Sequence, residues 1–105
     1  MIRVVVAGMG VNSGANDPGT ELATELRNGG MEAIFTGWNQ APEQVVRGAL
    51  QEDADAIGVC NGTAAVLSEI RGLLADEDAA DILVFASTIS PEAVVEWVQE
   101  HLAGE

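Results

Sequence analysis

The strongest constraint on the fold is a pattern that occurs four times along the chain. A short apolar run is followed by a loop and then by apolar residues at helical spacing. The runs are Ile2–Ala7, Glu32–Phe35, Ala56–Val59 and Ile82–Phe85. Because valine, isoleucine and phenylalanine occupy successive positions in them, the runs are typical of strands buried on both faces of a parallel sheet.

Each run is followed by a predicted helix with one apolar stripe to bury. Pro42 and Pro91 suit the first position of a helix, Ser90 is a natural N-cap, and Gly29 or Gly30 can take the left-handed conformation after the first helix. The stripes consist of Leu22, Ala23 and Leu26 in the first helix, Val45, Val46, Ala49 and Leu50 in the second, Val66, Leu67, Ile70, Leu73 and Leu74 in the third, and Val94, Val95, Val98 and Leu102 in the fourth.

Four βα units with right-handed crossovers predict an α/β fold, a flavodoxin-like doubly wound parallel sheet of strand order 2-1-3-4. The length of 105 residues indicates a single domain, residues 1–105. Ligands bind such sheets at the carboxyl ends of the strands, where the strand order reverses. Three loops are expected there: Gly8–Gly19, Cys60–Thr63 and Ala86–Ser90.

The composition restricts the partners. The chain has 17 acidic residues, four arginines and no lysine, with a net charge of −13, so its surface repels nucleic acid and anionic membranes. An acidic, lysine-free composition suits a salt-rich cytoplasm, where screening weakens self-repulsion, and we expect a halophilic source. The start of the chain lacks the pattern of a signal peptide, and Cys60 has no second cysteine to pair with, so a cytoplasmic protein is expected.

Three common motifs of this topology do not fit. Gly8-Met9-Gly10 lacks the third glycine of a dinucleotide fingerprint, and Ile34–Gly37 ends the second strand without the acidic residue that would bind a ribose. A P-loop requires a lysine. A receiver domain requires acidic residues at the ends of strands one and three, where this chain has Gly8, Met9 and Cys60.

Nearly the whole chain resembles one family, the cobalamin (vitamin B12)-binding domain of methylmalonyl-CoA mutase and related acyl-CoA mutases. The stretch TGWNQAPEQVV, residues 36–46, is similar to the family pattern TG-hydrophobe-x-Q-(T/S)-P-E-x-(I/V)-V. The matching segments are Arg3–Ala7, Ala23–Gly37, Ala41–Val46, Ala49–Gly58, Asp81–Val84 and Ser90–Glu92.

The first binding loop departs from that family. The family motif Asp-x-His-x-x-Gly supplies a histidine that ligates cobalt and an aspartate that orients it. Counting back from Gly19, the histidine position falls on Asn16 and the aspartate position on Gly14. An amide is a poor cobalt ligand, and the single histidine, His101, lies in the last predicted helix, where a solvent-facing cation is expected. We therefore expect no metal ligand from this chain, and cobalamin that is bound base-on or weakly, or not at all.

The other two loops also differ. The resemblance implies that the serine-rich family loop after strand three becomes Cys60–Thr63, and that the glycine pair after strand four becomes Ala86 and Ser87. Cys60 is expected to be an inert, small thiol, because no base or cation is evident beside it. The residues expected to line a cobalamin site are Asn16, Asp17, Gly19, Cys60, Thr63 and Ser87.

The family continues into a fifth strand that is missing here. Ile82–Phe85 should therefore form an open edge, and such edges pair with other chains unless they are covered or charged. Self-association, or docking on a larger mutase subunit, is expected. Trp38 and Trp97 either belong to that surface or are half-buried packing residues.

Three hypotheses for the function stay open. The first is a B12-binding-domain-like small subunit of a coenzyme B12-dependent acyl-CoA mutase, an isomerase, without the cobalt-ligating histidine. The second is a noncatalytic interaction or regulatory module that associates through its edge strand. The third is a binder of another nucleotide-like ligand, whose phosphate would take free amides near Gly19 and Thr20. Because no general base is evident at the loops, we expect no catalytic residue in the chain alone.

Overall fold

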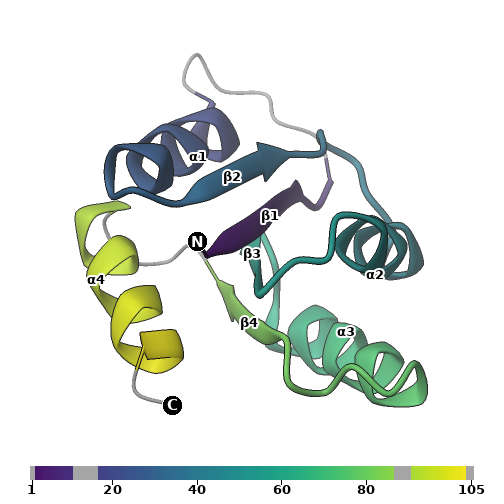
Figure 1. The fold of residues 1–105 in the computed structure, drawn as a ribbon. Helices are drawn as coiled ribbons and strands as arrows, with labels where there is room; N and C mark the ends of the chain where they lie inside the picture. The colour runs from purple at the N-terminus through teal and green to yellow at the C-terminus, as the bar shows by residue number, and fades with distance from the viewer. Residues whose placement is uncertain (1, 11–16, 87–90, 104–105) are drawn as a thin grey trace.

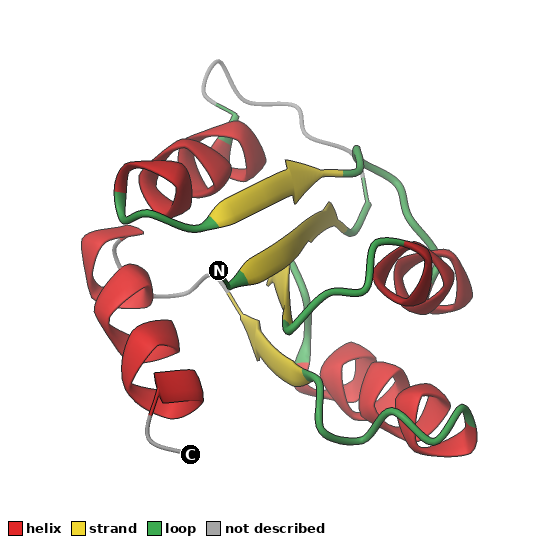
Figure 2. Ribbon diagram, viewed as in Figure 1, coloured by secondary structure: helices red, strands yellow, loops and turns green. Residues whose placement is uncertain are grey.

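The computed structural model describes residues 2–10, 17–86 and 91–103. Strands and helices alternate along them, and the helices cover both faces of a twisted sheet (Figures 1 and 2). The elements are β1 (Arg3–Gly8), α1 (Pro18–Asn28), β2 (Glu32–Phe35), α2 (Pro42–Gln51), β3 (Ala56–Cys60), α3 (Ala64–Asp76), β4 (Leu83–Ala86) and α4 (Pro91–Ala103). The four predicted βα units are confirmed.

The sheet has the order β2-β1-β3-β4, and every pairing is parallel. This confirms the flavodoxin-like prediction. β1 lies between β2 and β3, with Val5 opposite Ile34 on one side and opposite Ile57 on the other. β4 pairs with β3 alone, so it is an edge strand within the described part of the sheet, as the sequence predicted.

Alternate residues of β1 contribute to two separate cores. Val4 and Val6 pack with Leu26 on the face that α1 and α4 cover, whereas Val5 packs with Ile70 on the face that α2 and α3 cover (Figure 1). All five of these side chains are 0% exposed. Burying an aliphatic side chain of this size stabilises a fold by about 1.5–3 kcal/mol, so β1 anchors both layers.

Helix α4 packs beside α1, not beside α3. Val98 is fully buried, Gln99 Nε2 donates to the carbonyl oxygen of Gly29 at 3.1 Å, and the rings of Trp97 and Phe85 meet edge to face with centroids 5.6 Å apart. A right-handed crossover to a further parallel strand would place this helix on the α3 face. In this structure α4 covers the opposite face, beside α1.

The predicted helix boundaries agree with the structure where it describes them. Pro42 and Pro91 are the first residues of α2 and α4. After α1, Gly30 takes the left-handed conformation with φ of 89°, whereas Gly29 keeps a φ of −82°. Ser90, the predicted N-cap of α4, lies outside the described residues.

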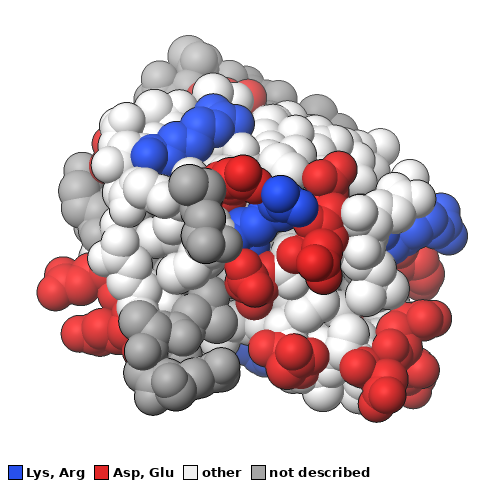
Figure 3. Space-filling view, viewed as in Figure 1, with Lys and Arg blue, Asp and Glu red and all other residues white. Residues whose placement is uncertain are grey.

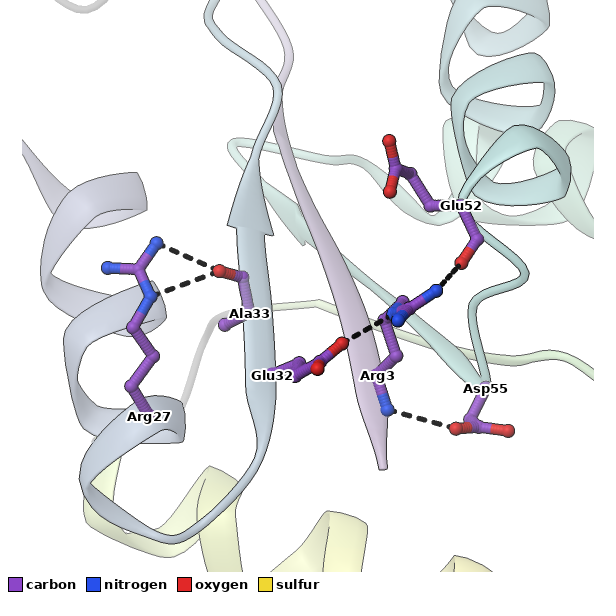
Figure 4. Close-up of polar contacts among 6 residues, drawn as sticks. All are labelled: Arg3, Arg27, Glu32, Ala33, Glu52 and Asp55. Carbon is purple, nitrogen blue, oxygen red and sulfur yellow. Dashed lines mark hydrogen bonds and ion pairs between the residues drawn. The ribbon is translucent and has the colours of Figure 1, made fainter. Parts of the chain in front are cut away.

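Arg3 joins the amino ends of three strands (Figure 4). Its Nε donates to Glu32 at 2.6 Å and its Nη1 donates to the carbonyl oxygen of Glu52 at 2.6 Å. Its backbone N–H donates to the Asp55 carboxylate at 2.9 Å. The hydrogen bond and the charge of Glu32 raise the pKa of Arg3. These contacts fix the starts of β1, β2 and β3 relative to one another.

Acidic side chains are spread over the face of the molecule shown in Figure 3, and the basic side chains on that face lie in a few separate places. This distribution follows from the net charge of −13. Within the described part of the chain, none of the helices has the length and apolar character needed to cross a membrane.

Two glycine-to-alanine substitutions test the packing, because they should change the free energy of unfolding in opposite directions. A Cβ on Gly58 in β3 would lie 2.8 Å from Cζ of Phe85, whereas a Cβ on Gly72 in α3 would meet no described atom within 4 Å. Because the Phe85 ring is buried, Gly58→Ala should lower the free energy of unfolding by about 1–3 kcal/mol. Gly72→Ala should raise it by about 0.5–1 kcal/mol, since alanine is the better helix former. Urea denaturation measures both, and equal effects from the two variants would contradict the packing described here.

Candidate functional site

The carboxyl end of β1 is joined to the segment that follows β2. The Gly8 N–H donates to the carbonyl oxygen of Gly37 at 2.9 Å, and the Gln40 N–H donates back to the carbonyl oxygen of Gly8 at 3.0 Å. The Asn39 N–H donates to the carbonyl oxygen of Gly10 at 2.7 Å. These bonds continue the β1–β2 pairing beyond the strands, so residues 37–40 form one wall of the face where the sequence predicts a ligand.

Trp38 covers the end of β1. A Cβ on Gly8 would lie only 2.3 Å from Cε3 of the indole, so the ring rests directly on the glycine backbone. The indole meets the Phe35 ring edge to face, with centroids 5.8 Å apart, and its Nε1 donates to Oδ1 of Asp17 at 3.2 Å. Trp38 therefore links the end of β1 to the start of α1.

Asp17 is the N-cap of α1. Its carboxylate accepts the N–H groups of Gly19 at 3.1 Å and Thr20 at 3.2 Å, the Thr20 hydroxyl at 3.0 Å, and the indole N–H of Trp38. Partial desolvation of the carboxylate opposes its ionisation, but the hydrogen bonds from Thr20, Trp38 and Gly19 outweigh it and hold the pKa of Asp17 below its ordinary value. The carboxylate is thus charged and fully engaged within the chain.

This cap corrects one expectation. The sequence suggested free amides at Gly19 and Thr20 that could receive a ligand phosphate, but both N–H groups donate to Asp17. An aspartate at the N-cap supplies from within the chain the negative charge that a helix N-terminus attracts. A phosphate would have to displace that carboxylate.

The turn after β3 adjoins the end of β1. The Met9 N–H donates to the carbonyl oxygen of Cys60 at 3.0 Å, and the Thr63 hydroxyl caps α3 by accepting the Val66 N–H at 3.2 Å. The Cys60 side chain is buried, with 1% of its surface exposed. A ligand on this face could therefore contact the backbone of residue 60 but not its thiol, which agrees with the expectation of a packing role.

The structure describes four of the six residues predicted to line the site. Asp17 and Gly19 lie at the start of α1, and Cys60 and Thr63 lie at the end of β3 and the start of α3. Gly19 is buried, because Phe35 covers it: a Cβ there would lie 2.4 Å from Cε1 of that ring. Asn16 and Ser87 lie outside the described residues, so their place at the site stays a prediction.

The side chains at the loop face determine whether the protein could ligate the cobalt of a bound cobalamin. His101 is in the last turn of α4, a helix that packs on the end of α1 through the bond of Gln99 to Gly29. Among the described residues, no three histidine, cysteine, aspartate or glutamate side chains form a cluster able to hold a metal ion. With Asp17 engaged, the described face offers backbone groups and the Thr63 hydroxyl, but no nitrogen donor suited to cobalt. The described residues of this face therefore do not fit ligation of cobalt.

The fold matches solved cobalamin proteins. A chain of the methanol:cobalamin methyltransferase complex from Methanosarcina barkeri superposes with a TM-score of 0.75 and 13% identity over 98% of this chain. A cobalamin-binding protein from Desulfitobacterium hafniense superposes with a TM-score of 0.66 and 15% identity over 97% of this chain. This chain spans 47% and 50% of the two solved chains. The fold is that of the flavodoxin-like cobalamin-binding domains.

A relative in sequence identifies the family within the cobalamin-binding fold. No protein-family model matches the sequence. The 2-hydroxyisobutanoyl-CoA mutase small subunit of Aquincola tertiaricarbonis is 37% identical over 95 residues, which cover 87% of this chain and 68% of that protein. The chain belongs to the family of that small subunit, the B12-binding domains of the mutase small-subunit type.

Sequence reasoning missed the link between Asp17 and Trp38. The Asp17-Pro18 pair is a signal for a helix N-cap followed by the first helical residue, and it was available from the sequence alone. The partner of the carboxylate was not available, because Trp38 is 21 residues away in the chain. From the sequence, Trp38 is expected only to pack or to take part in association.

The Asp17 contacts predict a pH dependence of stability. Because the pKa of Asp17 is lower in the folded state than its ordinary value, the stabilisation is complete above about pH 4 and is lost as the pH falls through the folded pKa. Asp17→Asn keeps an oxygen for the helix cap but does not titrate. The difference in free energy of unfolding between the natural chain and Asp17→Asn should therefore be positive near neutral pH and shrink below about pH 4.

Urea denaturation at a series of pH values measures this difference. Glu100→Gln, which removes one exposed carboxylate from α4, is the matched control for the loss of a charge. A difference that stays constant down to about pH 2.5 would contradict the assignment of a lowered pKa to Asp17.

Proposed function

We propose that this chain is the corrinoid-carrying small subunit of a coenzyme B12-dependent acyl-CoA mutase, and that cobalamin binds it without a cobalt ligand from the protein. The observation that carries this proposal is the 37% identity to a mutase small subunit across 87% of the chain. The corrinoid supplies the radical chemistry when it is bound, and the chain supplies its seat. We treat residues 1–105 as one domain.

The proposed seat is the face at the ends of β1 and β3. Asp17 and Trp38 hold the start of α1 over Gly8, and a Cβ at Gly10 would meet no described atom within 4 Å, so the backbone beyond β1 is accessible from the described side. We assign binding contacts to Asn16, Thr63 and Ser87 and a backbone contact to Cys60, whereas Asp17 and Gly19 support the site by holding the start of α1 in place. Cobalamin would bind this seat base-on or weakly, because none of the described residues there would ligate cobalt.

A larger subunit completes the enzyme in this proposal. Reactions of acyl-CoA require a binding site for the acyl-CoA and groups that act on it, and the loop face described here has neither a serine–histidine–acid set nor an available general base. The relative is named a small subunit, and the methyltransferase structure is a complex. The chain is therefore proposed to be noncatalytic until it joins its partner.

One observation favours a second candidate, an interaction module that has lost its ligand. The carboxylate of Asp17 and the indole N–H of Trp38 satisfy each other, so the described part of the face is internally bonded without any ligand. Such a module would regulate or scaffold a mutase without carrying a corrinoid.

Retention of cobalamin separates the two candidates. Purified protein is mixed with adenosylcobalamin or hydroxocobalamin and desalted, and the visible spectrum is recorded. The small-subunit proposal predicts that corrin absorbance elutes with the protein. Because a Cβ on Gly8 displaces Trp38, Gly8→Ala should retain less corrinoid than the natural chain, whereas Gly72→Ala, in α3, should retain as much. A colourless natural protein would contradict the proposal and support the interaction module.

A further inference from the structure

Both edge strands turn backbone groups away from the rest of the sheet. Backbone groups point alternately to the two sides of a strand. In β2, the Glu32 N–H donates to the carbonyl oxygen of Ile2, so the next residue, Ala33, faces away from β1. In β4, the Leu83 N–H donates to the carbonyl oxygen of Asp55, so Val84 faces away from β3. Strand addition at either edge requires these outward groups.

An arginine donates to one outward carbonyl oxygen at each edge. Arg27 donates from Nε at 3.1 Å and from Nη2 at 2.8 Å to the carbonyl oxygen of Ala33 (Figure 4). Arg71 donates from Nη2 at 3.1 Å to the carbonyl oxygen of Val84. Each arginine comes from the helix that directly precedes the edge strand in the chain, Arg27 from α1 and Arg71 from α3. One outward carbonyl oxygen of each edge strand is therefore held by an arginine in the same way.

Arg27 and Arg71 bind carbonyl oxygens although the chain is rich in carboxylates. The chain has four arginines, no lysine and 17 carboxylates, so each arginine has many acidic side chains to pair with. Among the described residues, the ion pair found is that of Arg3 with Glu32. Two of the four cations lie instead on the edge carbonyl oxygens, where a charge also opposes the approach of another strand.

The β4 edge is the one more prone to pair with another chain, because an apolar groove lies beside it. A groove of about 470 Å³ lies beside β4, and its apolar lining includes Leu74, Ile82, Leu83 and Trp97. An extended apolar segment could bury side chains in this groove while pairing with Val84. Arg71 also lines the groove, and its guanidinium holds the acceptor that such a segment needs.

We infer that Arg27 and Arg71 close the two edges of the sheet against strand addition, and that Arg71 prevents a second copy of this chain from pairing along β4. The open edge at Ile82–Phe85 that the sequence predicted is thus an edge whose outward carbonyl oxygen is already bonded. Association with a larger subunit then uses another surface, which leaves the loop face available for that contact.

The test compares two arginine-to-methionine variants that lose the same charge. Arg71→Met keeps an apolar stem but removes the donors from Val84, and Arg47→Met, at an exposed position of α2, is the matched control. Light scattering measures the mass at low salt and at about 1 M salt. The high salt is needed because its Debye length of about 3 Å suppresses the repulsion between acidic copies. Arg71→Met should gain the mass of a second chain at high salt, whereas the natural chain and Arg47→Met keep the mass they have at low salt.

A second substitution shows where the new contact forms. Val84→Pro removes the outward N–H, which an edge strand tolerates, and should return Arg71→Met to the mass of the natural chain. Hydrogen exchange gives an independent readout, since the Val84 amide should become protected only in the Arg71→Met dimer. Circular dichroism checks that each variant is folded. If folded Arg71→Met keeps the mass of the natural chain at high salt, or if its dimer survives Val84→Pro, the inference is overturned.

Discussion

The parallel pairing of β1 with both of its neighbours is the constraint on which the other features depend. Val5 lies opposite Ile34 on one side and Ile57 on the other, so β1 is buried on both faces and along both edges. This register brings the carboxyl end of β1 beside the segment after β2 and the turn after β3. The candidate site exists at this point because the strand order reverses there, as in other doubly wound sheets.

The loop face is held together by contacts within the chain. Trp38 rests on Gly8 and donates to Asp17, whose carboxylate also caps α1. In the cobalamin-binding family that the sequence resembles, an acidic residue near this place orients a cobalt-ligating histidine. Here the described carboxylate is engaged by amides, a hydroxyl and an indole, and the only histidine of the chain is at the far end of α4. The fold is retained, whereas the loop sequence differs from the family motif at Gly14 and Asn16.

The fold was predictable because its determinants are local. Apolar runs mark the strands, stripes at helical spacing mark the helices, and prolines mark helix starts, so the strand order could be predicted with the right-handed crossover rule. The site was predictable only in its location. Three contacts join separate elements: Trp38 with Asp17, α4 with α1, and Arg71 with Val84. The sequence alone allowed several partners for each of these side chains.

The central claim is that this domain carries a corrinoid without coordinating its cobalt, and electron paramagnetic resonance of cob(II)alamin tests it most directly. The unpaired electron on cobalt couples to a nitrogen nucleus in the lower axial position, and nitrogen-15 splits the signal differently from nitrogen-14. The spectrum is recorded with excess protein, unlabelled and uniformly labelled with nitrogen-15. The account predicts the same nitrogen-14 splitting in both samples, because the base of the cofactor is the ligand. A splitting that changes with the label of the protein would place one of its nitrogen atoms on cobalt and contradict the account.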